Sequence, residues 1–400
     1  MKDVMFDTSA LMFLLLVSPM ISVAHRIKRD SSHENNLVEN VRRKSTLRQV
    51  NLVIRHGERS PQSTYPKDPY IDDPMEPFGW GQLTNAGRLS QYNQGLFLRQ
   101  RYDQFLGTKY SPEVFWLQST AADRTKMSAL LEAAALWQPD DDQTFLSGLP
   151  WQPVTLNYQT KDQDDLLLLW ATCPDYARMR EAVLKSEEIQ IVNQMHKDLY
   201  EALKRHTGQS IENPDDVFDL YSTLDAERTM KLPLPQWADE YFPEKMECLS
   251  KLSLKMNVYN ESLLRMKAGP MISAIANNMV DKSRGNLKPA VRKMFMYVGH
   301  DSTISNLLEG MKIWDMQIPS YNIMTMIELH ENDNGYSVQV YLKNSTRFEP
   351  YPLIIPGCDF ACPLSQFLDI LRPMIMSQSE WRKDCVLKDE NYIPGQQPLP

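Results

Sequence analysis

The sequence predicts an α/β fold, built as a doubly wound and mostly parallel sheet with a helical cap inserted into it. Apolar runs at 49–54, 114–117 and 293–298 indicate buried strands, and a helical pattern follows each of them after a polar loop. This strand–loop–helix rhythm favours parallel strands covered by helices. Strand signals are few between 149 and 282, where helical patterns dominate. We therefore expect an α/β domain split between 48–148 and 283–390 around a cap at 149–282.

Residues 1–24 are typical of a signal peptide. An apolar run at 10–23 ends in Ser-Val-Ala and is too short to span a membrane comfortably. The polar, charged stretch 25–47 predicts a disordered leader. The C-terminal tail is polar and rich in proline. We therefore expect an exported protein with no membrane anchor.

The first half of the α/β domain contains two expected helices. One begins at Thr84 or Asn85 and ends at Gly107, and the other begins at Asp123. Apolar residues that recur at helical spacing predict the buried faces. For the first helix these are Leu89, Tyr92, Leu96, Leu98, Tyr102 and Phe105, and for the second Met127, Leu130, Leu131, Ala134 and Leu136.

The rest of the chain continues this pattern. Helical patterns in the cap cover 176–185, 189–207, 214–224 and 246–279. The strand at 293–298 precedes a helix at 301–311, and strands at 324–329 and 336–342 form a hairpin around Asn-Asp-Asn-Gly at 332–335.

Composition limits the classes of function. The 400 residues suit one large domain or two linked ones, and an apolar content of 42% is enough for a substantial core. A net charge of −8 argues against a nucleic-acid partner, because phosphate backbones are bound by basic faces. It leaves room for a local cluster of arginines.

Such a cluster follows the first strand, where Arg-His-Gly-Glu-Arg-Ser-Pro occupies 55–61. His56 would stand at the carboxyl end of a strand, where open α/β sheets bind ligands. Arg55 and Arg59 flank it, and burying these groups together is costly unless an anion shares the site. Gly57 would let the backbone approach that ligand. Since the arginine fork matches phosphate oxygens, we expect a phosphate site, with a solvated surface turn as the alternative.

Two further motifs have the same context. Gly-His-Asp at 299–301 follows a strand and opens a helix, so His300 and Asp301 would join the site, although Asp301 also suits a plain helix N-cap. Ser-Thr-Ala-Ala-Asp-Arg-Thr at 119–125 lies at another helix start, which favours an anion, and Arg124 adds a full charge. A surface pair of Asp123 with Arg124 is the alternative for this third motif.

These motifs resemble the signatures of the histidine acid phosphatases, within branch 2 of the histidine phosphatase superfamily. The resemblance extends from about residue 47 to 385 and is closest to the animal prostatic, lysosomal and insect-venom enzymes. It implies a phosphoglycerate mutase-like fold and the hydrolysis of small phosphate monoesters. Gly299 is a minor departure, because relatives most often have another small residue before His-Asp.

The resemblance also implies the roles of the site residues. His56 would be the nucleophile that forms a phosphohistidine, and Asp301 would protonate the leaving group. Four side chains would bind the phosphate and neutralise its charge: Arg55, Arg59, Arg124 and His300. The arginines would lower the pKa of His56 and keep it unprotonated in acid. We expect no metal and no cofactor, because the seven histidines show no ligand set.

Five cysteines in an exported chain favour disulfides. The resemblance implies two bridges and one free thiol: Cys173–Cys385, Cys358–Cys362 and Cys248. A third bridge of the relatives would join positions that Ala226 and Met324 occupy here. Asn260 and Asn344 begin glycosylation sequons, so we expect a secreted glycoprotein, with the lysosome as the other destination. Related enzymes are often dimers, which makes a homodimer one expectation.

Three alternatives stay open. The phosphoglycerate mutase branch shares Arg-His-Gly-Glu, but Arg59, Pro61, the leader and the bridges favour the acid phosphatases. A phytase-like inositol phosphate phosphatase ranks second, although phytases usually carry more cysteines and a more basic pocket. The third is a secreted, non-catalytic binding protein on the same fold, against which the intact motifs count.

Overall fold

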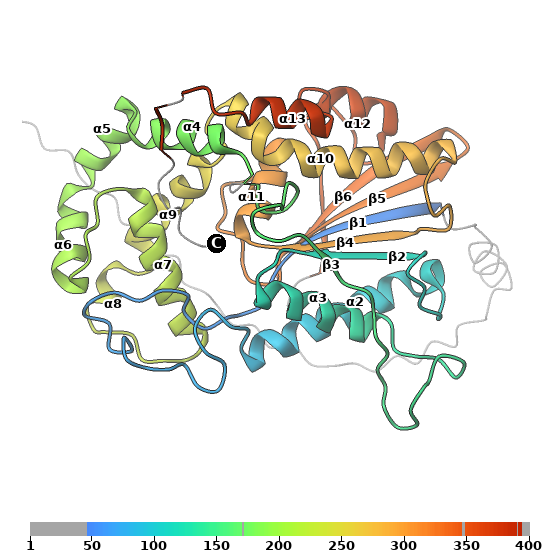
Figure 1. Cartoon of the computed structure of the whole chain (residues 1–400), viewed down its shortest axis with the longest axis horizontal. Helices are drawn as coiled ribbons and strands as arrows, with labels where there is room; N and C mark the ends of the chain where they lie inside the picture. Colours follow the sequence, from blue (N-terminus) through green and yellow to red (C-terminus); the bar gives the residue numbers. More distant parts are fainter. Residues whose placement is uncertain (1–45, 170–171, 346–348, 390, 394–400) are drawn as a thin grey trace, which may run out of the picture. The chain divides into compact units, whose positions relative to one another are not determined.

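A computed structural model describes residues 46–169, 172–345, 349–389 and 391–393 (Figure 1). The expected signal peptide and nearly all of the expected leader lie outside the described residues. None of the helices in the described part is both long and apolar enough to span a bilayer.

The sheet is mixed, which corrects the expectation of a mostly parallel one. Four strands run parallel in the order β3 (Asn157–Tyr158), β2 (Phe115–Ser119), β4 (Met294–Gly299) and β1 (Leu47–Arg55). Antiparallel strands extend the sheet beyond β1, namely β5 (Met324–Asn332), β6 (Gly335–Lys343) and β7 (Tyr351–Leu353), and β8 (Cys362–Pro363) also pairs with β6.

The direction of β5 has a local cause. The amide of Arg55 donates to the carbonyl of Ile323 at 3.0 Å, and the amide of Asn322 donates to the carbonyl of His56 at 3.3 Å. The chain therefore enters β5 beside the end of β1 and can only run back along it. The expected hairpin of β5 and β6 is present and adds further antiparallel strands.

Strand β1 lies inside the sheet, between β4 and β5. Val53 packs into the hydrophobic cluster on one face, and Val50, Leu52 and Ile54 pack into the cluster on the other. Burial on both faces explains why the strand is a continuous apolar run in the sequence.

Helices α2 (Asn85–Leu106) and α3 (Asp123–Leu136) cover one face (Figure 1). Their predicted buried faces are partly wrong, because Leu89, Leu96 and Leu130 are exposed. Small residues lie at the interface instead, and a Cβ on Gly95 would come 2.3 Å from the carbonyl oxygen of Glu132. Close packing of the two helices thus selects residues that hydrophobic periodicity does not detect.

The opposite face carries α10 (Glu261–Arg284), α11 (Asp301–Gly310), α12 (Leu364–Leu371) and α13 (Gln378–Asp384) (Figure 1). Residues of α10, α11 and α12 share one hydrophobic cluster with the sheet. Two disulfides have the expected pairing, Cys173–Cys385 and Cys358–Cys362, and Cys248 is free and exposed.

The remaining helices gather beyond the end of the sheet at which β1 leads into its loop (Figure 1). They are α4 (Pro174–Leu184), α5 (Glu187–Met195), α6 (Lys197–Thr207), α7 (Pro214–Thr229), α8 (Ala238–Tyr241) and α9 (Glu244–Met256). Helices α6 to α9 share their own hydrophobic cluster. Two expected helices are each divided, the first at His196 and the second at 257–260, where the side chain of Asn260 caps α10 by accepting from the amide of Leu263.

Candidate active site

The sheet brings the three motifs together. Arg55 at the end of β1 lies opposite Gly299 at the end of β4, and Ser119 at the end of β2 lies opposite Val298. The carboxyl ends of parallel strands meet at one edge, so the residues that follow them become neighbours. We call Arg55, His56, Arg59, Arg124, His300 and Asp301 the His56 cluster.

The imidazole of His56 is held in one tautomer. Its Nδ1 lies 2.8 Å from the carbonyl oxygen of Gly57, which can only accept a hydrogen bond. Nδ1 therefore carries the proton, and Nε2 presents its lone pair. The guanidinium of Arg124 donates to this lone pair from Nε at 3.2 Å, which agrees with the assignment.

His56 is also kept neutral. Burial lowers its pKa well below the usual value, and the charges of Arg124 and Arg55 lower it further. Only 2% of the residue is exposed, so loss of hydration is the larger cause. The sequence predicted the direction from the arginines alone and did not anticipate the contribution of burial.

Arg55 links three parts of the site. Its Nη2 lies 2.9 Å from Oδ2 of Asp301, and its Nη1 donates to the carbonyl oxygen of Pro319. Its Cζ lies 4.3 Å from the ring centre of Tyr321, which is also near His56. Tyr321 could not be predicted from the sequence, because a single tyrosine in a loop carries no motif.

His300 has the opposite tautomer to His56. Its Nδ1 lies 3.4 Å from Nη2 of Arg124, and its Nε2 lies 3.1 Å from Oγ1 of Thr120. Because arginine only donates, Nδ1 accepts and Nε2 donates to the hydroxyl. Burial and the charge of Arg124 lower the pKa of His300 as well. The two imidazole rings lie 5.5 Å apart, and both are neutral.

The role expected for Gly57 needs correction. A Cβ at this position would come 2.7 Å from the backbone oxygen of Gly87 in α2. The glycine therefore allows a helix, rather than a ligand, to approach the loop after β1. The neighbouring Glu58 contributes to the same packing, because its Oε2 accepts from Ser90 at 2.6 Å and from Asn322 at 3.2 Å.

Two residues of the His56 cluster, Arg59 and Asp301, line a pocket of about 580 Å³. Side chains from α4, α7 and α9 line the same pocket, and we call four of its residues the helical wall: Arg180, Asp215, Asp216 and Asp219. No sequence motif pointed to these four residues.

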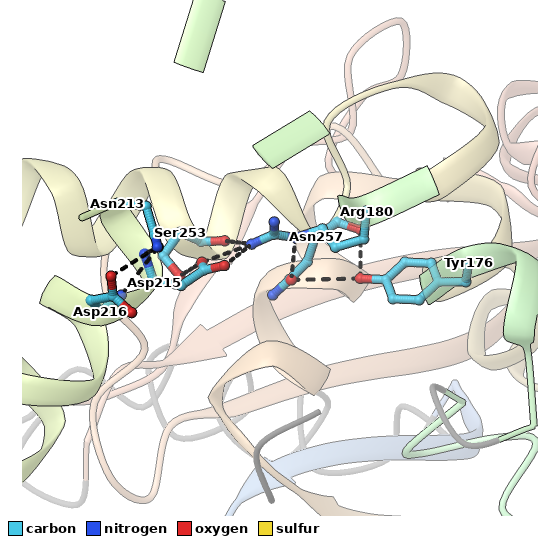
Figure 2. A network of polar contacts seen from close by, with 7 residues as sticks. All are labelled: Tyr176, Arg180, Asn213, Asp215, Asp216, Ser253 and Asn257. Carbon is cyan, nitrogen blue, oxygen red and sulfur yellow. Dashed lines mark hydrogen bonds and ion pairs between the residues drawn. The ribbon is translucent and has the colours of Figure 1, made fainter. Parts of the chain in front are cut away.

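A polar network holds this wall together (Figure 2). Nη2 of Arg180 lies 2.7 and 3.0 Å from the two carboxylate oxygens of Asp215, and its Nε donates to Asn257 at 3.1 Å. Ser253 also donates to Asp215, at 2.6 Å. Helices α4, α7 and α9 are thereby cross-linked beside the pocket.

Within the described ranges, no three His, Cys, Asp or Glu side chains are placed so that they could hold a metal ion. Asn260 is exposed and caps α10, while Asn344 lies close to Ser320. Their glycosylation stays a prediction.

Comparisons with solved structures show a common fold. Hafnia alvei phytase in its apo form aligns with a TM-score of 0.62 at 16% identity, over 83% of this chain and 97% of that one. The same phytase in complex with myo-inositol hexakis sulphate gives a TM-score of 0.63 at 17% identity, over the same shares. At these identities, the likeness concerns the fold alone.

Comparisons of sequence are more specific. The chain is 35% identical to prostatic acid phosphatase of Bos taurus over 87% of this chain and 89% of the relative. It is 32% identical to venom acid phosphatase Acph-1 of Apis mellifera over 86% and 89%. The family model described as histidine phosphatase superfamily (branch 2) matches residues 46–343. The motifs that meet around His56 therefore belong to a known family, and this chain is a member of branch 2 of the histidine phosphatase superfamily.

Proposed function

We propose that this protein is an acid phosphatase that hydrolyses phosphate monoesters through a phosphohistidine on His56. The observation that carries the proposal is a neutral imidazole whose Nε2 lone pair faces the guanidinium of Arg124. The names of the relatives, which include prostatic, lysosomal and venom acid phosphatases, support the same reaction.

Substrate binding rearranges the charge pairs of the cluster. A phosphate dianion competes for Arg124, which releases the lone pair of His56. It also competes for Arg55, and Asp301, freed from its ion pair, takes up a proton from the solvent. With Arg59, the three guanidinium groups neutralise the non-bridging oxygens, which is the main requirement of phosphoryl transfer. His300 can donate to the phosphate only after a proton moves to its Nδ1, and a bound dianion favours that protonation.

Two transfers then complete the reaction. Nε2 of His56 attacks phosphorus, the N–P bond forms as the ester O–P bond breaks, and the leaving oxygen takes a proton from Asp301. Asp301 next accepts a proton from water, whose oxygen attacks phosphorus while the N–P bond breaks. The products are an alcohol, inorganic phosphate and the original imidazole.

Trapping of the intermediate tests this proposal. The protein is mixed with a phosphate-labelled aryl monoester and quenched, and peptides are mapped under alkaline conditions, in which phosphohistidine survives. Label on His56, and none in a His56→Ala variant, is expected. Label on another residue would overturn the nucleophile assignment, and aryl phosphate hydrolysis without any label would point to direct attack by water.

The wider expectations fit this function. We propose that α4 to α9, which lie within the expected cap at 149–282, cover the site, since residues of α4, α7 and α9 line the same pocket as Asp301. Among the relatives are lysosomal and venom acid phosphatases, and we propose that this chain is likewise exported. The complete His56 cluster favours an enzyme over a binding protein that has lost turnover.

A further inference from the structure

The cations of the pocket beyond the His56 cluster are already paired. Arg180 is almost fully buried, and its Nη2 contacts both carboxylate oxygens of Asp215 (Figure 2). Lys185, which also lines the pocket, forms an ion pair with Glu181 one helical turn earlier on α4. The buried charge of Arg180 is thereby committed to Asp215, whereas the pair of Lys185 is exposed to solvent.

Two acids of the same wall have no cation partner. Asp216 accepts from neutral donors only, the amide of Glu212 and Nδ2 of Asn213, both at 2.8 Å. Asp219 lies one turn further along α7 and makes no hydrogen bond or ion pair with the described residues. Its side chain is accessible and lines the same pocket as Arg59 and Asp301.

The residues that line the pocket therefore differ in charge. Arg59 belongs to the cluster that receives the phosphate, and Asp301 stands where the leaving group departs. Asp216 and Asp219 line the same pocket from α7, and the rest of the substrate must fill that pocket. An anion placed there would be repelled by Asp219, whereas an ammonium would be attracted to it.

We propose that Asp219, assisted by Asp216, determines substrate specificity by favouring monoesters with a neutral or cationic leaving group over those that carry further negative charge. This inference rests on the proposed phosphatase function. Where Asp219 is charged, it disfavours polyanionic inositol phosphates as substrates, because they would bring several phosphate groups against a carboxylate that has no cation partner. At such a pH, the inference separates this chain from the phytases that share its fold.

The protonation of Asp219 gives the proposal a pH signature. Partial loss of hydration in the pocket raises its pKa to about 7, and Asp215 and Asp216 add to the rise while Arg59 opposes it. The other charged or titratable groups that line the pocket are Arg180, Glu181, Lys185, Asp301 and Tyr392. Asp219 is thus neutral in acid and becomes charged as the pH passes through about 7.

A pair of matched substrates tests the proposal. Phosphoethanolamine and 3-phosphoglycerate have similar sizes, and their ammonium and carboxylate groups keep their charges between about pH 5 and pH 8. Both substrates contain a phosphate group that ionises in this range. The ratio of their kcat/KM values therefore largely removes the pH dependence that this ionisation causes. We expect the ratio to favour phosphoethanolamine and to rise roughly three- to tenfold from pH 5.5 to pH 8, the size of one charge interaction near a surface.

Two variants test whether the rise of the ratio with pH comes from Asp219. Asp219→Asn should flatten the rise with pH and lower the ratio at pH 8, while hydrolysis of p-nitrophenyl phosphate stays close to that of the unmodified protein. Asp198→Asn is the matched control, because it removes an exposed carboxylate on α6, outside the pocket.

The outcomes distinguish failure of the specificity inference from failure of the proposed phosphatase function. At pH 8, an unchanged ratio in Asp219→Asn, or hydrolysis of inositol hexakisphosphate by the unmodified protein as efficient as that of phosphoethanolamine, would overturn the specificity inference and leave the phosphatase function intact. No hydrolysis of p-nitrophenyl phosphate by the unmodified protein would instead refute the proposed function.

Discussion

Residues of the His56 cluster and of the helical wall line one pocket, but the two are built in different ways. The cluster is basic, and its residues follow the ends of parallel strands whose register places them side by side. The wall is acidic, and its residues come from α4 and α7; a side-chain network joins Arg180, Asp215 and Asp216 (Figure 2), whereas Asp219 stands outside it. We propose from this comparison that the sheet fixes the reaction, whereas the helices choose which substrates undergo it.

The sharpest test of this division removes the nucleophile. His56→Ala should lower kcat on p-nitrophenyl phosphate by about 10⁴-fold or more, because the variant can no longer form the covalent intermediate. His196→Ala, between α5 and α6, is the control and should keep full activity. Retention of a tenth of the activity by His56→Ala would place the chemistry elsewhere.

Replacing the proposed acid should give an effect that depends on the leaving group. We expect Asp301→Asn to slow alkyl phosphates by about 10²- to 10⁴-fold, because their leaving oxygen needs a proton. A p-nitrophenyl leaving group needs less assistance and should be slowed far less. Equal slowing of both substrates would show that Asp301 acts through its ion pair with Arg55 and not as the acid.

A substitution within the helical wall should lower the stability of the protein and leave the rate of the reaction nearly unchanged. Asp215→Ala leaves the buried guanidinium of Arg180 without its carboxylate, so we expect the free energy of unfolding to fall by about 2 kcal/mol. Activity on p-nitrophenyl phosphate should stay within about threefold of the original. Urea denaturation measures the change.

A more exposed ion pair provides the control for that experiment. Asp225→Ala breaks a pair with Arg228 on the same helix and should cost no more than about 0.5 kcal/mol. Equal losses from the two variants would show that burial of Arg180 adds nothing to the strength of the wall.

The smallest expected effect concerns α3, which supports the cluster through Arg124. Glu132 on this helix is fully buried, neither of its oxygens has a hydrogen-bond partner, and burial raises its pKa well above the usual value. The folded protein then keeps Glu132 protonated at a pH where the unfolded chain has released the proton. The contribution of Glu132 to stability is therefore largest in acid, and it falls as the pH rises toward the raised pKa.

Glu132→Gln should remove this dependence. Between pH 5 and pH 6, we expect the variant to gain about 1 kcal/mol relative to the unmodified protein, and at most about 1.4 kcal/mol. Urea denaturation at both pH values checks this, with the exposed Glu113→Gln as control. A constant difference between variant and unmodified protein would mean that Glu132 is ionised in the fold.

The sequence predicted the site residues that follow recognisable strand patterns. His56, His300 and Arg124 follow strand patterns directly, so their convergence could be predicted from the rule for parallel sheets. The direction of β5 could not, because it depends on where the chain re-enters the sheet. Tyr321 contacts Arg55 from a loop without a motif, so only the folded chain shows it.

The helix faces show a second limit. Hydrophobic periodicity placed Leu89 and Leu130 inside, but α2 and α3 approach so closely that glycine, alanine and serine fill the interface. The helical wall was missed for a related reason. Its acids look like ordinary surface residues in the sequence, and only the fold shows that they line the same pocket as Asp301.

The position of β1 has a consequence for biosynthesis. The strand that leads into His56 is translated well before both of its hydrogen-bonding neighbours, β4 and β5, which lie far along the chain from it. Contacts so distant in sequence slow folding and leave an apolar strand with two open edges meanwhile. The His56 cluster can therefore assemble only after β4 and β5 have been translated, and until then the open edges of β1 are exposed to aggregation.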